Sequence, residues 1–310
     1  MIAVDMDGTL LGTDGKVSAR NLAAMHAAER VGVEVVVATG RRHCYAMRQL
    51  RGLGLREESA LVSSNGAVTR TLGAQLLERT LMAKSTAMWL CGHIDEFRNA
   101  LVMTFDRVGP DGEDARGALV VEHLDELHGS IGKWMVANAP YIAQIMPIER
   151  AMESGEAPIQ MMLCGTVERM RRAEARLLEH PGVSAVGVSM QEHGASGEVA
   201  LHRTEYPERD LSIVDILPPG CSKGSALVRL AVKRGIKMEE MLAIGDNWND
   251  VSMLEVAGRA VLMGNAPDPL KEMAAGRGWA LGGRHDEDGV AEASEGALEG
   301  LPAGTLSGMH

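Results

Sequence analysis

The stretch MIAVDMDGTLL at residues 1–11 joins a short apolar run to a pair of carboxylates. Residues 2–4 are apolar and predict a buried strand, which ends at Asp5. Asp7 follows two positions later, and Gly8 allows the chain to turn there. Two carboxylates at this spacing allow one to attack or bind a metal while the other transfers protons. A simple Asp/Gly turn is the alternative interpretation of this segment taken alone.

A second polar cluster follows the β-branched run at residues 33–38, which predicts a strand buried on both faces. It reads Thr39-Gly40-Arg41. A hydroxyl, a glycine and neighbouring backbone N–H groups are able to hold phosphoryl oxygens. Thr39 is alternatively the N-cap of the helix predicted over residues 42–50.

A third cluster contains Lys223, in the first turn of the helix predicted over residues 222–234. A cation at a helix N-terminus opposes the helix dipole, and a bound anion reverses that penalty. The alternative interpretation is a solvated surface lysine.

A fourth cluster follows the strand predicted over residues 241–245 and contains Asp246, Asn249 and Asp250. Carboxylate and amide oxygens around a strand-to-helix turn are the ligands that Mg²⁺ prefers. The alternative is an Asp/Asn-rich helix cap.

The alternation of strands and helices around these clusters predicts a parallel α/β sheet. Ligands of such sheets bind outside the carboxyl ends of the strands, so we expect the four clusters to converge. Phosphoryl transfer requires all four clusters together, because an anionic nucleophile and a phosphate repel each other. That repulsion is about 4 kcal/mol per charge pair at about 4 Å and an effective dielectric of about 20. Mg²⁺ and a lysine offset it.

The middle of the chain has a different pattern and predicts an inserted α+β lobe. We expect one α/β domain at residues 1–82 and 209–310, with the insert at 83–208. The segment from residue 301 has weak periodicity and is expected to be disordered. The elements predicted around and within the insert are a hairpin at 68–80, helices at 85–97 and 167–179, and strands at 159–164, 183–188 and 199–201.

Composition limits the classes of partner. The chain has 310 residues, 45% hydrophobic content and a formal net charge of -11. An acidic surface repels nucleic acid and anionic membranes, so a small molecule is the expected partner. The sequence has no apolar run long enough for a transmembrane helix and no signal peptide pattern. The four cysteines form no CxxC pair, which favours free thiols in the cytoplasm over a disulfide framework.

Taken together, these segments resemble the four ordered motifs of the haloacid dehalogenase (HAD) superfamily. The resemblance rests on DMDGTLL (5–11), VVVATGRR (35–42), SKG (222–224) and GDNWNDVSML (245–254). The insert resembles the type IIB cap of Cof-type hydrolases, and SNGA at 64–67 is similar to that subfamily as well. The resemblance implies a Rossmann-like HAD core with a parallel sheet, an inserted α+β cap domain and a Mg²⁺-dependent phosphatase.

The resemblance also implies roles for individual residues. Asp5 is expected to be the nucleophile that forms an aspartyl-phosphate and to bind Mg²⁺. Asp7 is expected to be the general acid and base, with its backbone carbonyl on Mg²⁺. Thr39 and Lys223 are expected to bind and stabilise the phosphoryl group, and Asp246 to be a Mg²⁺ ligand.

Further residues are expected around the phosphate. By the same resemblance, Asn249 is expected to contact the phosphate or the substrate. Asp250 is expected to orient Lys223 or the metal-bound waters. Gly40 and Arg41 flank the phosphate site.

Two departures from the family pattern leave the choice of substrate open. Gln160 stands where the family often has a lysine, and His285 where it commonly has an asparagine. The expected reaction is hydrolysis of a small phosphate ester, such as a sugar phosphate, a flavin precursor or pyridoxal phosphate. A phosphomutase is the first alternative, and a phosphometabolite-binding protein without activity is the second.

Overall fold

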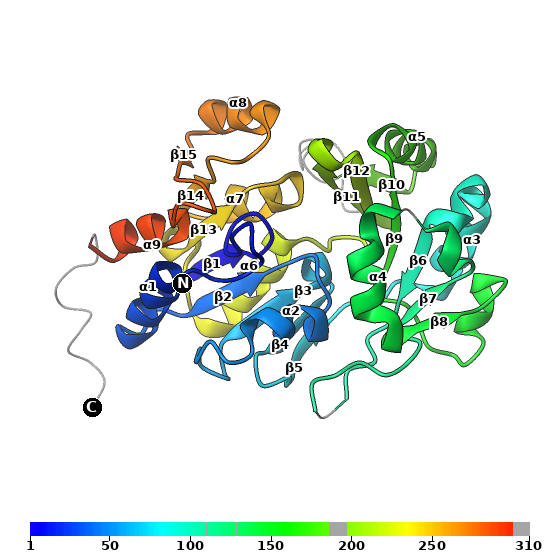
Figure 1. Cartoon of the computed structure of the whole chain (residues 1–310), viewed down its shortest axis with the longest axis horizontal. Coiled ribbons are helices and arrows are strands. Elements are labelled where there is room, and N and C mark those ends of the chain that lie inside the picture. The colour runs from blue at the N-terminus through cyan, green and yellow to red at the C-terminus, as the bar shows by residue number, and fades with distance from the viewer. Residues whose placement is uncertain (110, 128, 186–196, 300–310) are drawn as a thin grey trace. The chain divides into compact units, whose positions relative to one another are not determined.

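The structure, a computed structural model, describes residues 1–109, 111–127, 129–185 and 197–299. The chain divides into two compact units. The first joins Met1–Gln75 to Lys223–His310, and the second is Leu76–Ser222 (Figure 1). The chain therefore leaves the first unit, builds the second and returns to the first.

The first unit is built on strands β15-β14-β13-β1-β2-β3-β4 of a mainly parallel sheet, and the last strand in the order of this sheet, β5, is the first segment of the second unit. β1 is parallel to β2 on one side and to β13 on the other, and β4 runs antiparallel to β3. This arrangement confirms the predicted α/β fold. The bounds are β1 Ile2–Asp5, β2 Val35–Ala38, β3 Ala60–Ser63, β4 Val68–Thr71, β5 Leu76–Arg79, β13 Leu242–Gly245, β14 Arg259–Leu262 and β15 Ala280–Leu281.

The central strands explain how the polar clusters converge. β1, β2 and β13 are buried along their whole length, which requires the continuous apolar runs of their sequences. Asp5 is level with Ala38 of β2, and Thr39 and Asp246 directly follow β2 and β13. Because the three strands are parallel, these residues lie at the same edge of the sheet.

Helices pack against this sheet. α1 begins after Ser18, whose Oγ accepts a hydrogen bond from the backbone N of Asn21 at 3.1 Å and so caps the helix. α1 packs beside α9 (Figure 1), a helix that the sequence pattern does not predict because its Ala-, Glu- and Gly-rich segment has few large apolar side chains. The bounds are α1 Ala19–Arg30, α2 His43–Leu50, α6 Lys223–Arg234, α7 Val251–Val256, α8 Asp268–Arg277 and α9 Gly289–Glu299.

The second unit contains a mixed sheet with the strand order β10-β11-β12-β9-β6-β7-β8. β9 runs antiparallel to β6 and β12, whereas β7 is parallel to β8. The strands are β6 Leu101–Thr104, β7 Leu119–Val121, β8 Ile142–Gln144, β9 Gln160–Gly165, β10 Val183–Ala185, β11 Val199–Tyr206 and β12 Leu211–Leu217. The helices are α3 Lys84–His93, α4 Gly132–Asn138 and α5 Val167–Leu178.

The sheet of the second unit buries side chains on both faces. Side chains alternate between the faces along a strand. Met161 and Leu163 of β9 belong to the core that includes α3 and α5. Cys164 belongs to the other core, against which the partly buried side chains of Met162 and of Trp134 in α4 pack. The region from β7 to β8, including α4, has no counterpart among the predicted elements.

The structure and the sequence put the boundaries of the insert at different residues. From the sequence we expect the insert at residues 83–208, whereas the second unit runs from Leu76 to Ser222. The end differs because β12 pairs with both β9 and β11, so this strand completes the second sheet before the chain returns.

Other predicted elements differ in length. The helix predicted over 85–97 ends at His93 and is followed by the 3-10 turn Asp95–Ala100. Of the strand predicted at 183–188, residues 186–188 lie outside the described residues, as does the segment from 301. Among the described residues, no helix is long and apolar enough to cross a membrane.

Candidate active site

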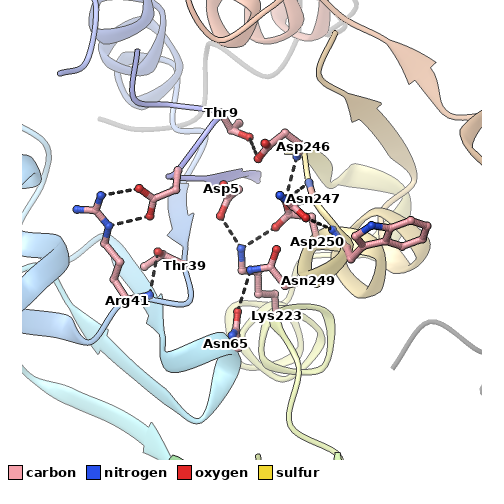
Figure 2. A network of polar contacts seen from close by, with 12 residues as sticks. Asp5, Thr9, Thr39, Arg41, Asn65, Lys223, Asp246, Asn247, Asn249 and Asp250 are labelled. Atoms are coloured by element: carbon pink, nitrogen blue, oxygen red, sulfur yellow. Dashed lines mark hydrogen bonds and ion pairs between the residues drawn. The ribbon is translucent and has the colours of Figure 1, made fainter. Parts of the chain in front are cut away.

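Lys223 is the centre of a buried charge cluster at the carboxyl edge of the first sheet. Its Nζ donates to Asp5 Oδ1 at 2.5 Å and to Asp250 Oδ1 at 2.6 Å (Figure 2). Lys223 and Asp250 are fully buried, and Asp5 is 3% exposed. Buried charges persist only where they are paired. The alternative interpretation of Lys223 as a surface lysine is therefore wrong.

Asp250 organises the loop that follows β13. Its Oδ2 accepts hydrogen bonds from the backbone N of Asp246 at 2.9 Å and of Asn247 at 3.0 Å. Because Oδ1 is bonded to Lys223, both carboxylate oxygens are engaged. Asn247 also caps the 3-10 turn Trp248–Asp250. The alternative interpretation of this segment as a helix cap is confirmed, and the cap fixes the backbone of Asp246.

Two side chains donate hydrogen bonds to the carboxylate of Asp246. Thr9 Oγ1 donates to its Oδ1 at 3.0 Å, and Asn265 Nδ2 to its Oδ2 at 3.3 Å. Asn265 Nδ2 also donates to the backbone O of Gly8 at 2.8 Å, and its Oδ1 accepts from the backbone N of His285 at 3.0 Å. Gly8 has φ +80°, and a Cβ there would collide with the Asp246 carboxylate, so this position requires glycine.

Burial and mutual repulsion disfavour the charged forms of these acids. Burial, followed by the charge of Asp250, raises the pKa of Asp5 from 3.8 to about 7 although Lys223 opposes the shift. Burial, followed by the charge of Asp5, also raises the pKa of Asp246 well above its usual value. Burial alone lowers the pKa of Lys223, but Asp250 and Asp5 outweigh that effect and raise it. The cluster is therefore short of positive charge.

A divalent cation fits this cluster. Oxygens of Asp5, Asp246 and Asp250 lie within 4.8 Å of one another, which makes these three residues a group able to hold a metal ion. Such hard oxygen ligands suit Mg²⁺. The raised pKa values of Asp5 and Asp246 show that the Lys223 ammonium does not compensate the three carboxylates. A divalent cation bound between these carboxylates would supply the missing positive charge.

Asp7 lies in a separate ion pair with Arg41. Arg41 Nη2 donates to Asp7 Oδ1 at 2.5 Å, and Nε to Oδ2 at 2.7 Å. Such a two-point pair fixes the orientation of the carboxylate. Arg41 is itself fixed, because Nη1 donates to Gln49 Oε1 at 2.8 Å and the guanidinium carbon lies 4.8 Å from the centre of the Tyr45 ring.

Thr39 lies in the loop between β2 and α2. Its Oγ1 accepts a hydrogen bond from the backbone N of Arg41 at 3.1 Å, which leaves the hydroxyl proton available to a ligand. α2 begins at His43 and its N-cap is Arg42. The alternative interpretation of Thr39 as the N-cap of this helix is therefore wrong.

The structure brings most of the predicted residues together at one edge of the sheet. Asp5, Lys223, Asp246 and Asp250 form the charge cluster, Asp7 and Arg41 form the neighbouring pair, and Thr39 and Gly40 lie in the loop with Arg41. Asn249 Nδ2 donates to Asn65 Oδ1 at 3.2 Å. The predicted role of the Asp7 carbonyl in metal binding has no counterpart among these contacts and stays a prediction.

Three polar residues of the site were not assigned a role from the sequence. The sequence position of each residue could have indicated a place in the site. Thr9 closes the DMDGT segment, Asn65 follows the third strand, and Asn265 follows β14. The last two occupy the same place as the predicted clusters, directly after a strand of the parallel sheet. The rule about carboxyl ends therefore applies to them as well.

The comparisons with known proteins agree with this geometry. The family model of the haloacid dehalogenase-like hydrolases matches residues 2–293. A solved structure described as a haloacid dehalogenase-like hydrolase from B. subtilis superposes with a TM-score of 0.72 at 26% identity, covering 95% of this chain and 98% of that one.

Curated relatives of similar length are phosphatases. The 5-amino-6-(5-phospho-D-ribitylamino)uracil phosphatase YwtE of Bacillus subtilis is 30% identical over 307 residues, which cover 94% of this chain and 95% of that protein. The pyridoxal phosphate phosphatase YbhA of Escherichia coli is 28% identical over 276 residues, covering 88% of this chain and 91% of that protein.

Proposed function

We propose that this chain, which belongs to the haloacid dehalogenase-like hydrolase family and is a phosphatase of small phosphorylated metabolites, acts with Mg²⁺ through a phosphoryl group carried on Asp5. The observation that carries the proposal is the position of Lys223, which is bonded to both Asp5 and Asp250. A buried ammonium next to a carboxylate at the carboxyl edge of the sheet is placed to neutralise an arriving phosphate.

In the proposed first step, Asp5 attacks the phosphorus atom of the ester. A bond forms between an Asp5 oxygen and phosphorus as the bond from phosphorus to the ester oxygen breaks. Asp7 gives a proton to the departing alcohol oxygen. Lys223 donates to the phosphoryl oxygens, and the Thr39 hydroxyl is the second donor we assign to them.

In the second step, Asp7 accepts a proton from a water molecule, which attacks the same phosphorus atom. The bond from phosphorus to Asp5 breaks, inorganic phosphate leaves and the Asp5 carboxylate is restored. Asp250 keeps Lys223 and the loop of Asp246 in place during both steps.

We assign Mg²⁺ to Asp5 and Asp246, with Asp7 contributing its backbone carbonyl. Bound there, Mg²⁺ supplies positive charge against the repulsion between Asp5 and the phosphate. Asp250 is the weaker candidate for direct coordination, because its oxygens already accept from Lys223 and two backbone amides.

Arg41 controls whether the Asp7 carboxylate is free to transfer a proton in the proposed mechanism. Its guanidinium holds both oxygens of the Asp7 carboxylate. Asp7 needs one of those oxygens for proton transfer, so the pair must loosen when substrate arrives. We propose that a negatively charged substrate competes for Arg41 and thereby releases Asp7. Gly40 and Asn249 are assigned to the walls of the phosphate site.

We propose that the second unit acts as a type IIB cap whose loops select the substrate and exclude water in the first step. The names of the two relatives favour cofactor-related phosphates as substrates, such as a flavin precursor or pyridoxal phosphate. Sugar phosphates stay the second class expected from the sequence. The cytoplasmic location expected from the sequence stays a prediction.

The testing experiment measures phosphate release from an aryl phosphate with Mg²⁺ and with EDTA, followed by a panel of sugar and cofactor phosphates. We expect release that depends on Mg²⁺, with one class of substrate clearly preferred. Release that is unaffected by EDTA would contradict the metal assignment. If no ester releases phosphate unless a bisphosphate primer is added, the protein is a phosphomutase instead.

A further inference from the structure

The turn that follows β3 has an unusual backbone. Ser64 has φ +48° and Asn65 has φ +49°, so two successive residues other than glycine are left-handed. This conformation is unfavourable for side chains with a Cβ, although asparagine tolerates it better than most. Among the described residues, the buried Ser64 Oγ also has no hydrogen-bond partner. Such costs persist where the surrounding structure imposes them.

The turn is connected to the loop after β2. The backbone N of Asn65 donates to Thr39 O at 3.1 Å, and the backbone N of Ser64 donates to Arg41 O at 2.9 Å. The Asn65 carboxamide lies directly against Gly40, where an added Cβ would be 3.2 Å from both Nδ2 and Oδ1. The turn therefore holds the loop that contains Thr39 through two backbone hydrogen bonds and the contact with Gly40.

The same turn is connected to two other parts of the site. Asn65 Oδ1 accepts a hydrogen bond from Asn249 Nδ2 at 3.2 Å (Figure 2). The turn Ser64–Gly66 also packs against α6, the helix that begins with Lys223. Asn65 is completely buried, so its amide cannot exchange these contacts for water.

From these contacts we infer that Asn65 is a positioning residue for phosphoryl transfer, which sets the separation between the Thr39–Arg41 loop and Asn249. This inference rests on the proposed function and goes beyond it, because Asn65 does not belong to the reacting groups. Phosphoryl transfer depends mainly on placement, and a displacement of about 1 Å costs about 100-fold in rate. The left-handed turn is what directs the Asn65 side chain between the two segments.

Asn65→Gly is the variant that tests this inference. Glycine adopts positive φ readily, so the backbone of the turn is kept while the carboxamide is lost. Ser64→Gly is the matched control, because it relaxes the neighbouring left-handed residue and leaves the carboxamide in place. Each variant is assayed with Mg²⁺ and p-nitrophenyl phosphate, with inorganic phosphate as inhibitor, and its Tm is measured.

We expect Asn65→Gly to lower kcat by about 10- to 100-fold and to raise the inhibition constant of inorganic phosphate by about 10-fold. Ser64→Gly should keep both within about twofold, and both variants should melt within a few degrees of the wild type. A loss of stability alone would not change the inhibition constant of the folded enzyme. If Asn65→Gly keeps kcat and phosphate inhibition within about twofold of the wild type, the inference is wrong.

A double-mutant cycle tests whether Asn65 acts through Asn249. In an Asn249→Ala background, Asn65→Gly should lose at least half of its logarithmic effect on kcat, because the partner of the amide is already gone. An undiminished effect would overturn the inference.

The failure of the proposed function would look different from the failure of this inference. If the wild type hydrolyses no ester, the proposed function fails. In that case inorganic phosphate with Mg²⁺ should still raise the Tm of the wild type more than that of Asn65→Gly. Equal shifts, or no shift of either protein, would overturn the positioning role.

Discussion

Two acidic clusters, one in each unit, have carboxyl pKa values shifted in opposite directions. In the first unit, Asp5 and Asp250 share the ammonium of Lys223, and burial raises the pKa of Asp5 to about 7. In the second unit, Glu122 and Glu149 share the guanidinium of Arg98. Arg98 donates to Glu122 at 2.7 and 3.1 Å and to Glu149 at 2.6 and 2.9 Å, two bonds to each carboxylate.

The shift has the opposite sign in the second cluster. The hydrogen bonds from Arg98 lower the pKa of Glu122, and the backbone N of Ile148 adds another donor to Glu122 at 2.7 Å. A guanidinium has enough donors in one plane to satisfy two carboxylates, whereas the Lys223 ammonium leaves its carboxylates undercompensated. These opposite shifts support a structural role for the Arg98 cluster and our proposal that the Lys223 cluster binds a cation and an anion.

Replacing Asp5 with Asn tests the reactive side of this comparison and has the largest expected effect. An amide cannot attack phosphorus, so kcat should fall by about 10,000-fold or more. The measurement is phosphate release from an aryl phosphate, with circular dichroism as a check of the fold. Asp14→Asn, at an exposed position in the following loop, should change kcat by less than about twofold. Activity of Asp5→Asn within tenfold of the wild type would refute the assignment.

Replacing Arg98 with Met tests the structural side. It leaves the buried Glu122 carboxylate without the donors that hold it charged, so we expect unfolding to become easier by about 2–3 kcal/mol. Urea unfolding of the variant measures this change. Arg150→Met removes the exposed pair with Glu153 and should cost less than about 0.5 kcal/mol. Equal stability of Arg98→Met and Arg150→Met would show that the Arg98 cluster is not structural.

Arg41→Gln tests the link between Arg41 and Asp7. The variant lacks the guanidinium that the substrate anion is proposed to bind when it releases Asp7, so kcat/KM should fall by about 10-fold to 100-fold. The Arg48 guanidinium lies over the same Tyr45 ring at 5.5 Å, so Arg48→Gln is the matched control and should retain kcat/KM. Steady-state kinetics on both variants provide the comparison. If both lose activity equally, contact with Tyr45 and not the pair with Asp7 is what matters.

Removing the metal should expose the charge imbalance of the Lys223 cluster as a pH dependence of stability. The pKa of Asp5 is 3.8 in its ordinary state and about 7 in the fold, so between these values the folded chain binds a proton that the unfolded chain does not. This contribution to stability is complete below pH 3.8 and is lost as the pH rises through about 7. The Tm of EDTA-treated protein should therefore fall from pH 5 to pH 8 by about a few degrees.

Asp5→Asn is the control for that measurement. The variant has no proton to lose at this position, so its Tm in EDTA should fall less over the same pH interval than that of the wild type. Calorimetry at pH 5, 6, 7 and 8 measures both curves. Parallel curves would show that Asp5 does not carry the pH dependence.

Much of the candidate site could be predicted from the sequence because the clusters of Asp5, Thr39 and Asp246 lie at the ends of continuous apolar strands of one sheet. Asp5, Thr39 and Asp246 converge for the reason used to predict them, the common direction of β1, β2 and β13. The pairing of Asp7 with Arg41 was not predictable, because both residues had other expected roles and only their side-chain rotamers bring them together.

The second unit was harder to predict because its contacts join distant segments. β12 was not among the predicted strands, and nothing local indicates that this segment pairs with β9 and not with the first sheet. The Arg98 cluster joins three segments of the insert and has no sequence motif. Asn65 was visible as part of a family motif, yet its connection to Asn249 requires the fold.

The most direct test of the account is to look for the phosphoryl group on Asp5. The full chain is mixed with Mg²⁺ and a phosphate ester labelled with ³²P, and the reaction is quenched in acid within milliseconds. We expect label on the peptide that contains Asp5, release of that label by hydroxylamine, and no label on Asp5→Asn. Rapid turnover without label on that peptide, or equal labelling of Asp5→Asn, would contradict it.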